Sequence, residues 1–289
     1  MITLPQYIRP KLFCSFSGGR TSGYMAYWIK QNLSDTFDIR YIFANTGQEH
    51  EKTLEFVNRC DQEWGLNVVW IEPVVHYNEK KSSTHKIVDY HTATRDGSLF
   101  ENMAKKYGIP SMPTPFCTRE LKVNPMKSYV RSLDWKAGSY VTAIGLRSDE
   151  MDRVNENFEK ELLWYPLISL GVTKEKVRSW WASMPFDLDL PEHLGNCTWC
   201  WKKSLRKHLT LAKDYPELFE VPKMLEEKYR FVGPTGQERF LFRGNRNTQD
   251  ILELSKMPFE HFTDTPEPLL QLDLDLSNGC SESCEVYTA

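Results

Sequence analysis

Residues 14–22, Cys-Ser-Phe-Ser-Gly-Gly-Arg-Thr-Ser, have the residue types of an anion-binding turn. An apolar run over residues 7–16 ends in Ser17-Gly18-Gly19, and a helix-compatible segment opens at Thr21-Ser22. Backbone N–H groups and the helix dipole then point at one place, and glycine lets a phosphate approach closely. Arg20 adds a candidate charge-assisted contact. The spacing fits neither Walker A nor Gly-x-Gly-x-x-Gly, so an ordinary strand–turn–helix junction remains the alternative.

Three cysteines form a second group with chemical potential. Cys197-Thr-Trp-Cys200 places two thiolates within reach of one metal, and Cys117 lies far upstream. Zinc sites, redox disulfides and iron–sulfur clusters all use this spacing. Without a histidine partner the three leave a Cys₄ zinc site incomplete, but they can hold a [4Fe–4S] cluster with another ligand on the fourth iron.

The fourth cluster ligand stays open at this stage. The candidates are Cys14, Cys60, Cys280 and Cys284, or a ligand from outside the protein, and Cys60 is expected to be a core thiol instead. A buried thiol at Cys117 beside an unrelated redox pair is the alternative reading of the whole group.

Alternating strand and helix signals surround these residues in the first half of the chain. Strand-like runs cover residues 39–44, 66–71 (closed by Glu72-Pro73) and 140–146, and residues 51–64 have helical spacing. This alternation predicts an α/β fold, a doubly wound, mainly parallel sheet flanked by helices, with ligands at the carboxyl ends of the strands. The turns at Ser17-Gly18-Gly19, Thr46-Gly47 and Gly145-Leu146-Arg147 each follow a strand, so we expect them at one edge.

The remaining segments are less regular. Residues 77–115 are polar and predict a long excursion, or lid, with one helix near residues 99–107. Helices are expected at residues 172–181 and 202–212, periodicity weakens beyond residue 214, and residues 275–289 are expected to be mobile. We therefore predict a nucleotide-binding domain over residues 1–210 that carries the cluster cysteines, and a mostly helical or irregular extension over residues 211–289.

Composition limits the class of protein. The chain has 289 residues, of which 40% are apolar, enough for a real core. A net charge of −3 argues against a protein that coats nucleic acid, although a local basic patch can still bind it. No apolar run nears 18 residues and no signal-like N-terminus is present, which predicts a cytoplasmic protein without a membrane contact. Its seven cysteines are then ligands, nucleophiles or buried thiols.

Four segments, in order, resemble one known family. Residues 17–22 resemble the PP-loop of the ATP pyrophosphatase superfamily, which normally reads Ser-Gly-Gly-x-Asp-Ser. Residues 44–47 resemble the Asp-Thr-Gly segment of phosphoadenosine phosphosulfate (PAPS) reductases, and residues 144–150 with Arg153 resemble that family's Gly-Ile/Leu-Arg-x-Asp segment. Cys117, Lys122 and Pro125, followed by Cys197 and Cys200, are similar to the cluster pattern of adenylyl-sulfate (APS) reductases.

The resemblance, which covers roughly residues 10–205, implies roles for individual residues. An adenine nucleotide (ATP, APS or PAPS) would be held through the backbone of the loop and the hydroxyls of Ser17, Thr21 and Ser22, and Mg²⁺ is an optional companion of ATP. Thr46-Gly47 would form part of the ribose or adenine wall, with Gly145 nearby. The cations expected to neutralise phosphate are Arg20, Lys122, Arg147 and Arg153, of which Lys122 and Arg147 are the candidate catalytic residues.

The departures from the family pattern bear on the reaction. Cluster-bearing reductases have Cys-Cys where this chain has Cys117-Thr118, and Thr21 and Asn45 stand where the family has acidic residues. The tail, residues 279–285, does not match the reductases' nucleophile motif, Glu-Cys-Gly-Leu-His. The unmatched tail disfavours reduction, and a three-cysteine cluster with one open iron favours ATP-dependent sulfur transfer to a nucleic acid or small molecule through an adenylated intermediate. Thr21 counts against ATP chemistry, since an acidic residue there is what the family uses with magnesium.

Two other functions stay open. One is reduction of APS or PAPS to sulfite with a thioredoxin-like thiol donor, for which Cys280 or Cys284 would supply the nucleophile. The other is a non-catalytic nucleotide- or cluster-binding module. A basic helix is a candidate surface for nucleic acid, and an ordinary solvated face is the alternative. Its residues are Lys202, Lys203, Arg206, Lys207 and His208, with Trp199 and Trp201 beside them. The sequence leaves the oligomeric state open, and a homodimer is one possibility.

Overall fold

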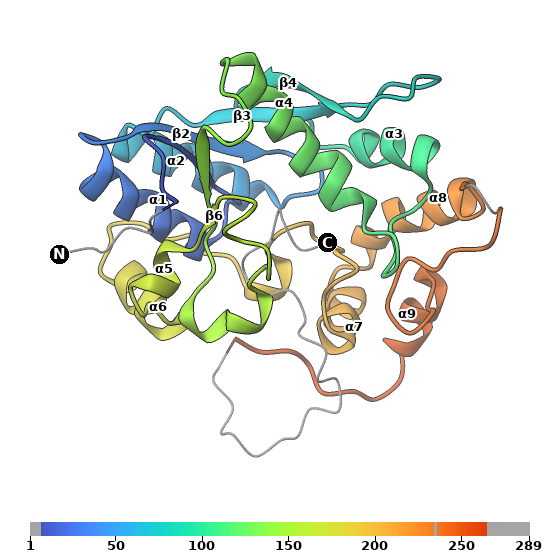
Figure 1. Cartoon of the computed structure of the whole chain (residues 1–289). Coiled ribbons are helices and arrows are strands. Elements are labelled where there is room, and N and C mark those ends of the chain that lie inside the picture. The colour runs from blue at the N-terminus through green and yellow to red at the C-terminus, as the bar shows by residue number, and fades with distance from the viewer. Residues whose placement is uncertain (1–6, 234–235, 265–289) are drawn as a thin grey trace.

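The computed structural model describes residues 7–233 and 236–264, and its centre is a six-stranded sheet (Figure 1). The strand order is β4-β3-β2-β1-β5-β6, and every neighbouring pair is parallel except β3 with β4. The strands are β1 (Lys11–Ser15), β2 (Asp38–Ala44), β3 (Val69–Val74), β4 (Thr84–Val88), β5 (Tyr140–Ala143) and β6 (Leu163–Trp164). The predicted α/β class with a mainly parallel sheet is confirmed.

The order of the strands creates a crevice beside β1. The chain moves from β1 to β2 and β3 on one side, and β5 then pairs with β1 on the other side. Loops that leave the carboxyl ends of β1 and β5 therefore diverge, which is where open α/β sheets bind ligands. The turns after β1 and after β5 both lie at this switch point.

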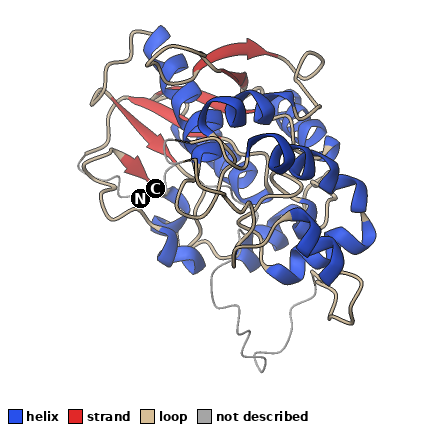
Figure 2. Ribbon diagram, turned by 90° about the vertical axis from the view of Figure 1, so that its right-hand side faces the viewer, coloured by secondary structure: helices blue, strands red, loops and turns tan. Residues whose placement is uncertain are grey.

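Helices cover both faces of the sheet, as Figure 2 shows. Leu12 and Cys14 of β1 pack into a core shared with α1, α2 and α6, whereas Phe13 packs with Met126 and Val130 of α4 on the other face. Alternate side chains of a strand point to opposite faces, so one short buried strand serves both cores. The α-helices are α1 (Arg20–Leu33), α2 (Glu51–Trp64), α3 (Ser98–Tyr107), α4 (Asn124–Ser132), α5 (Pro166–Ser169), α6 (Lys174–Ala182), α7 (Leu205–Asp214), α8 (Glu220–Tyr229) and α9 (Thr248–Leu254).

The edge of the sheet differs from the prediction in two respects. We expected the third strand to end at Glu72-Pro73, but β3 continues to Val74. The pairing of β3 with β2 already ends at Ile71, so no residue of β2 has to accept a hydrogen bond from Pro73, which lacks an N–H group. Its partner beyond that point is β4, an antiparallel edge strand inside the segment that we expected to be a loop. No residue of β4 is buried, and the consecutive residues Lys86 and Ile87 are both exposed, so β4 lacks the apolar run of the inner strands.

The C-terminal part is helical, as expected, although its sequence periodicity is weak. In Figure 1, α7, α8 and α9 gather on the side of α3, and Lys228 and Tyr229 of α8 both donate to Glu101 of α3. The predicted boundary at residue 210 falls inside α7, and the division into two units remains a prediction. The predicted tail, with Cys280 and Cys284, lies outside the described residues. None of the described helices is both long and apolar enough to cross a bilayer.

Candidate functional site

The turn after β1 has the geometry of an anion-binding loop. Gly18 has a φ of +84°, and Gly19 is the extended residue from which α1 begins. The Ser22 hydroxyl donates to the Gly19 carbonyl at 3.0 Å and accepts from the Ser17 hydroxyl at 3.0 Å. No side chain caps the first turn of α1, so the N–H groups of that turn are available to an anion in the loop. The predicted PP-loop residues are therefore brought together.

Two glycines of this site are required by close packing. A Cβ on Gly18 would lie 2.7 Å from Cγ2 of Thr53 on α2, in a backbone conformation that side chains rarely adopt. A Cβ on Gly145 would lie 3.2 Å from the backbone Cα of Ser22. The loop after β5 therefore rests directly on the first turn of α1, which explains the glycine at each position.

Arg147 connects the two loops at the switch point. Its side chain is 3% exposed, and its Nη1 donates to Thr21 Oγ1 at 3.0 Å. Asp149 accepts from Arg147 Nε at 3.0 Å, and the buried Glu150 lies 3.4 Å from Nη1. Arg153 reaches the same group through an ion pair with Glu150. The sequence analysis missed Glu150, although an acidic side chain three residues after Arg147 at a helix start is a capping signal.

The Arg20 side chain contacts a segment far along the chain. Its Nε pairs with Asp187 Oδ1 at 2.7 Å, and Nη1 donates to the Leu190 carbonyl at 3.2 Å. These contacts hold residues 187–201, which we call the strap. The strap crosses the turn after β1, which we call the anion loop, and a small pocket lies between the two segments. The pocket is lined by Gly18, Gly19, Arg20, Thr53, Leu188, Leu190, Pro191, Glu192, Gly195 and Asn196.

The middle of the strap is tied down by a buried carboxylate. Glu192 pairs with Lys207 of α7 at 2.7 Å and with Lys174 of α6 at 2.5 Å. Burial alone would raise the pKa of Glu192, but the two lysines outweigh it and hold the pKa at about 2. The carboxylate therefore stays charged and fixes the strap between two helices.

The predicted basic surface around α7 is exposed only in part. Lys203, Lys207 and His208 are 3%, 6% and 2% exposed, so neither the predicted nucleic-acid contact nor a solvated face describes them, whereas Lys202 and Arg206 are half-buried. Lys203 Nζ donates to the carbonyls of Gly195 at 2.7 Å and Cys197 at 3.0 Å. Burial lowers the pKa of His208 to about 3, and its neutral ring bonds the Cys200 carbonyl. These polar side chains hold the strap from beneath, which a hydropathy pattern does not reveal.

The end of the strap brings the three predicted metal-ligating cysteines to one pocket. Cys117, Cys197 and Cys200 line it together with Thr46 and Lys122, and the other lining residues are Phe100, Thr118, Trp199, Trp201 and Lys202. This arrangement depends on backbone pairing between distant segments: Thr198 N donates to the Gln48 carbonyl at 2.9 Å, and Glu49 forms a β-bridge with Cys197. We call this the thiol pocket.

Polar groups of the β2 turn and a tryptophan contact the sulfur atoms. Thr46 Oγ1 lies 3.2 Å from Cys197 Sγ, and Trp201 Nε1 lies 3.5 Å from Cys117 Sγ. Glu49, which the sequence analysis missed, accepts from Thr46 N at 2.9 Å and from Thr46 Oγ1 at 2.7 Å. Thr46, predicted as a wall of the nucleotide site, is therefore also part of the thiol pocket.

Lys122 reaches the thiol pocket from an unusual helix. Residues Thr118–Val123 form a π-helix that continues into α4, and such widened turns are frequent at functional sites. The side chain of Lys122 is 7% exposed. Glu120, on the same turn, accepts from Ser83 N at 3.0 Å and from the Ser83 hydroxyl at 2.8 Å, which anchors the turn to the segment before β4.

The donor set suits a thiolate-held group, although no such site is already assembled. Cys117, Cys197 and Cys200 are free thiols around one pocket. Within residues 7–233 and 236–264, no three His, Cys, Asp or Glu side chains are grouped closely enough to hold a metal ion. Cys14 and Cys60 lie in the main core, where burial raises the pKa of each thiol, so Cys60 is the core thiol that we expected.

Asn45 explains one departure from the family pattern. Its amide donates to Glu72 Oε1 and to the Thr94 carbonyl, both at 2.8 Å, and its Oδ1 accepts from Gly47 N at 3.1 Å. Glu72 is 2% exposed, so an aspartate at position 45 would bury two carboxylates side by side. The carboxylate of Glu72 therefore requires a neutral amide donor at position 45.

Comparison with known proteins agrees with this geometry. The sequence profile of the phosphoadenosine phosphosulfate reductase domain matches residues 11–183, which include both switch-point loops and Cys117 but stop before the strap. The chain is 30% identical over 279 residues to the nin region protein ORF290 of Escherichia phage lambda, described as uncharacterized, with 94% of each chain covered.

Two proteins of Methanocaldococcus jannaschii, also described as uncharacterized, share shorter regions. MJ0066 is 23% identical over 123 residues, which are 43% of this chain and 20% of MJ0066. MJ0973 is 25% identical over 117 residues, which are 40% of this chain and 22% of MJ0973. Members of the reductase-domain family bind adenine nucleotide substrates and are usually enzymes. With the profile covering more than half of its length, this chain belongs to the phosphoadenosine phosphosulfate reductase domain family.

Proposed function

We propose that the protein uses ATP to activate an oxygen-bearing acceptor and then replaces that oxygen with sulfur. The observation that carries the proposal is the strap, because one segment both covers the anion loop at Glu192 and supplies Cys197 and Cys200 to the thiol pocket. An adenylated acceptor at the loop would therefore lie next to thiol groups without any large rearrangement of the fold.

The chemistry divides into two balanced steps. The acceptor oxygen attacks the α-phosphorus of ATP, the bond to the β-phosphate oxygen breaks, and pyrophosphate leaves. A sulfur nucleophile such as hydrosulfide then attacks the activated carbon or phosphorus of the acceptor, and AMP leaves with the original oxygen. Backbone N–H groups of residues 18–22 would bind the phosphate oxygens, and Arg147 would stabilise the charge that develops as pyrophosphate departs.

The thiol pocket suggests where the sulfur would be held. Cys117, Cys197 and Cys200 would hold a [4Fe–4S] cluster, and the chemistry it supplies when bound is an iron position open to inorganic sulfur. Lys122 lines the same pocket and would attract an anionic sulfur species or acceptor. Mg²⁺ would accompany ATP.

Reduction of APS or PAPS is the second candidate, and the Cys197–Cys200 turn favours it. Cys200 N donates to the Cys197 carbonyl at 3.0 Å, so the two free thiols belong to one tight turn. Oxidation of such a dithiol to a disulfide releases the two electrons that this reduction consumes. The products are sulfite and AMP from APS, or sulfite and adenosine 3′,5′-bisphosphate from PAPS, and a thioredoxin-like donor would restore the dithiol.

One experiment separates these functions. Anaerobically purified protein, with its iron content measured, is given either APS or PAPS with reduced thioredoxin, or MgATP with sulfide and candidate acceptors. Sulfite at catalytic turnover would establish reduction, and acceptor-dependent pyrophosphate release with a thiolated product would establish sulfur transfer. Arg147→Ala should abolish either turnover, whereas Lys86→Gln, an exposed change on β4, should leave it unchanged. Neither product from iron-loaded protein would point to a non-catalytic binding module.

A further inference from the structure

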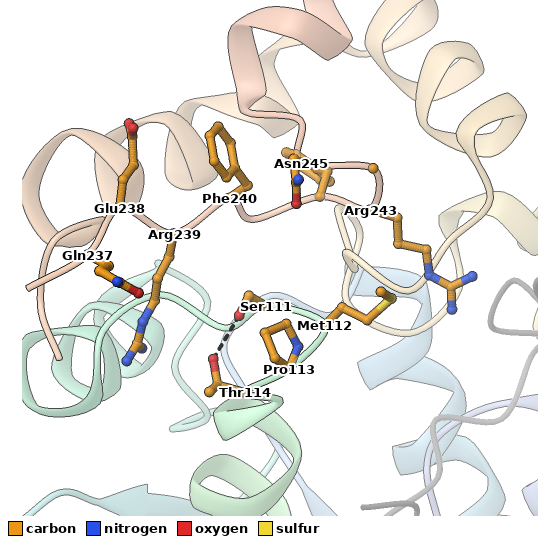
Figure 3. Close-up of a pocket in the computed structure, with 12 residues that line it drawn as sticks. Ser111, Met112, Pro113, Thr114, Gln237, Glu238, Arg239, Phe240, Arg243 and Asn245 are labelled. Carbon is orange, nitrogen blue, oxygen red and sulfur yellow. Dashed lines mark hydrogen bonds between the residues drawn. The ribbon is translucent and has the colours of Figure 1, made fainter. Parts of the chain in front are cut away.

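A second, larger cavity lies outside the anion loop. It has a volume of about 400 Å³, within the range of small-molecule sites, and lies between residues 111–114 and residues 237–245. Figure 3 shows Arg239 at one end, Met112 and Arg243 at the other, and the hydrogen-bonded hydroxyls of Ser111 and Thr114 between them. The proposed reaction does not use this cavity.

The walls of the cavity suit a ligand that is anionic and partly planar. Arg239 donates to the Tyr107 carbonyl at 2.7 Å and lies 5.4 Å from the Phe116 ring centroid, and neither contact neutralises its charge. The cavity's carboxylate, Glu238, is directed away from residues 111–114 and pairs with Arg230 at 3.4 Å. Met112, 68% exposed, supplies an apolar surface at the edge.

The cavity is joined to the thiol pocket on two sides. Residues 111–114 lead directly into Cys117, and Phe116 N donates to the Thr114 carbonyl at 2.8 Å. On the other side, Phe242 lines the cavity, and its ring centroid lies 4.8 Å from that of His208. The His208 ring in turn forms a hydrogen bond of 2.9 Å with the Cys200 carbonyl. A ligand in the cavity would therefore sit beside the groups proposed to deliver sulfur.

Cation–aromatic pairs continue from the cavity toward the thiol pocket. Arg119 lies 4.9 Å from the Phe116 ring centroid and is also ion-paired with the buried Glu120 at 2.8 Å. Lys202, which lines the thiol pocket, lies 5.6 Å from the ring centroid of Trp201, which is 4% exposed. Cations spaced along a surface bind the phosphates of unpaired nucleic acid. A free mononucleotide would fill the cavity without using these outer positions, so they favour a strand over a single unit.

We propose that this cavity and the neighbouring cations bind a single-stranded nucleic acid, with one nucleotide seated in the cavity. The inference rests on the proposed sulfur transfer only in naming that strand as the sulfur acceptor. It replaces the buried part of the predicted basic helix with a surface that keeps Lys202 and adds Arg119, Arg239 and Arg243. Paired duplex would not seat a nucleotide in the cavity, because its bases are paired and stacked within the double helix.

The test measures anisotropy of fluorescently labelled single-stranded DNA and RNA oligonucleotides with the full-length protein at two salt concentrations. Arg243→Gln and Arg119→Gln should each weaken binding, Arg243→Gln about tenfold, with a shallower salt dependence. Pro113→Trp, which fills the cavity mouth without changing charge, should weaken binding similarly. Lys86→Gln removes an exposed charge far from the cavity on β4 and should change nothing, and thermal unfolding confirms that each variant is folded.

The outcomes divide clearly. Equal binding by the wild type and by the Arg243, Arg119 and Pro113 variants would overturn the proposal, as would displacement of the oligonucleotide by AMP at equal concentration, which would mean a mononucleotide site. Equal affinity for duplex would overturn it as well. The assay contains no ATP, sulfide or turnover, so absence of sulfur transfer leaves its result intact. Absence of strand binding by the wild type, in a preparation that thiolates a small acceptor, would refute this inference and leave the proposed function intact.

Discussion

The anion loop and the strap lie against each other but are built in different ways. The anion loop is local: residues 15–23 turn from β1 into α1 through backbone hydrogen bonds and a glycine with positive φ. The strap has almost no regular structure and is held by side chains from α1, α2, α6 and α7, including Arg20, Lys52, Lys174 and Lys207. We therefore expect the conformation of the anion loop to tolerate changes of the surrounding side chains, whereas the position of the strap should depend on each ion pair that holds it.

The extent of the family match follows the same division. The reductase-domain profile covers the sheet and both switch-point loops and ends at residue 183, just before the strap begins. The strap is also the segment that completes the thiol pocket. The loop proposed to bind phosphate thus lies within the range of the family profile, whereas the thiol pocket combines Thr46, Cys117 and Lys122 from inside that range with Cys197 and Cys200 from beyond it.

The largest expected effect comes from cutting the central tether of the strap. Glu192→Gln leaves the buried ammonium of Lys207 without its carboxylate, and breaking a buried pair costs about 3–5 kcal/mol. Urea unfolding should show this loss. The matched control is Glu101→Gln, which breaks the more exposed pair with Lys228 and should cost less than about 1 kcal/mol. Equal losses in the two variants would mean that the strap is not specially dependent on this tether.

The same carboxylate predicts a pH dependence. Its pKa is about 2 in the folded protein against an ordinary 4.5, so its contribution is complete above pH 4.5 and is lost as pH falls toward 2. Linkage makes that contribution about 3 kcal/mol. Stability measured from pH 6 to pH 3 should therefore fall more steeply in the wild type than in Glu192→Gln. Parallel curves would contradict the ionisation assigned to Glu192.

A smaller effect is expected from the anion loop. Gly18→Ala forces positive φ on a side chain and pushes a methyl to 2.7 Å from Thr53, which together cost about 2–3 kcal/mol and should abolish nucleotide binding. Gly65→Ala has a similar positive φ, at +59°, but open space around it, so it should cost about 1 kcal/mol and leave nucleotide binding intact. Calorimetry and nucleotide titration of both variants isolate the packing contribution at Gly18.

The smallest effect is expected at the thiol end of the strap. Lys203→Met removes two hydrogen bonds, to Gly195 and Cys197, and should cost about 1–2 kcal/mol while loosening the cysteine turn. Faster alkylation of Cys197 and Cys200, read by mass spectrometry, checks this. Lys213→Met alters an exposed lysine of α7 that does not line the thiol pocket and should leave the alkylation rate unchanged. An unchanged rate in Lys203→Met would show that the lysine does not restrain the turn.

The fold and half of the site were predictable because their signals are local. The Ser-Gly-Gly turn, the β2 run and the helix over residues 51–64 each follow from a short pattern, and the structure places them as expected. The strand β4 and the contacts of Arg20 were not predictable. No residue of β4 is buried, so its sequence has neither an apolar run nor a clear alternation, and the partner of Arg20, Asp187, is distant in sequence.

By itself the sequence determined the α/β class, the family and the anion loop, since backbone conformation and hydrophobic spacing are properties of neighbouring residues. Only the tertiary structure decided which charges face solvent. Lys203, Lys207 and His208 form a basic run in sequence, yet folding buries all three beneath the strap, where carbonyls and Glu192 satisfy them. Burial and pairing depend on partners brought from other elements, and no local pattern contains them.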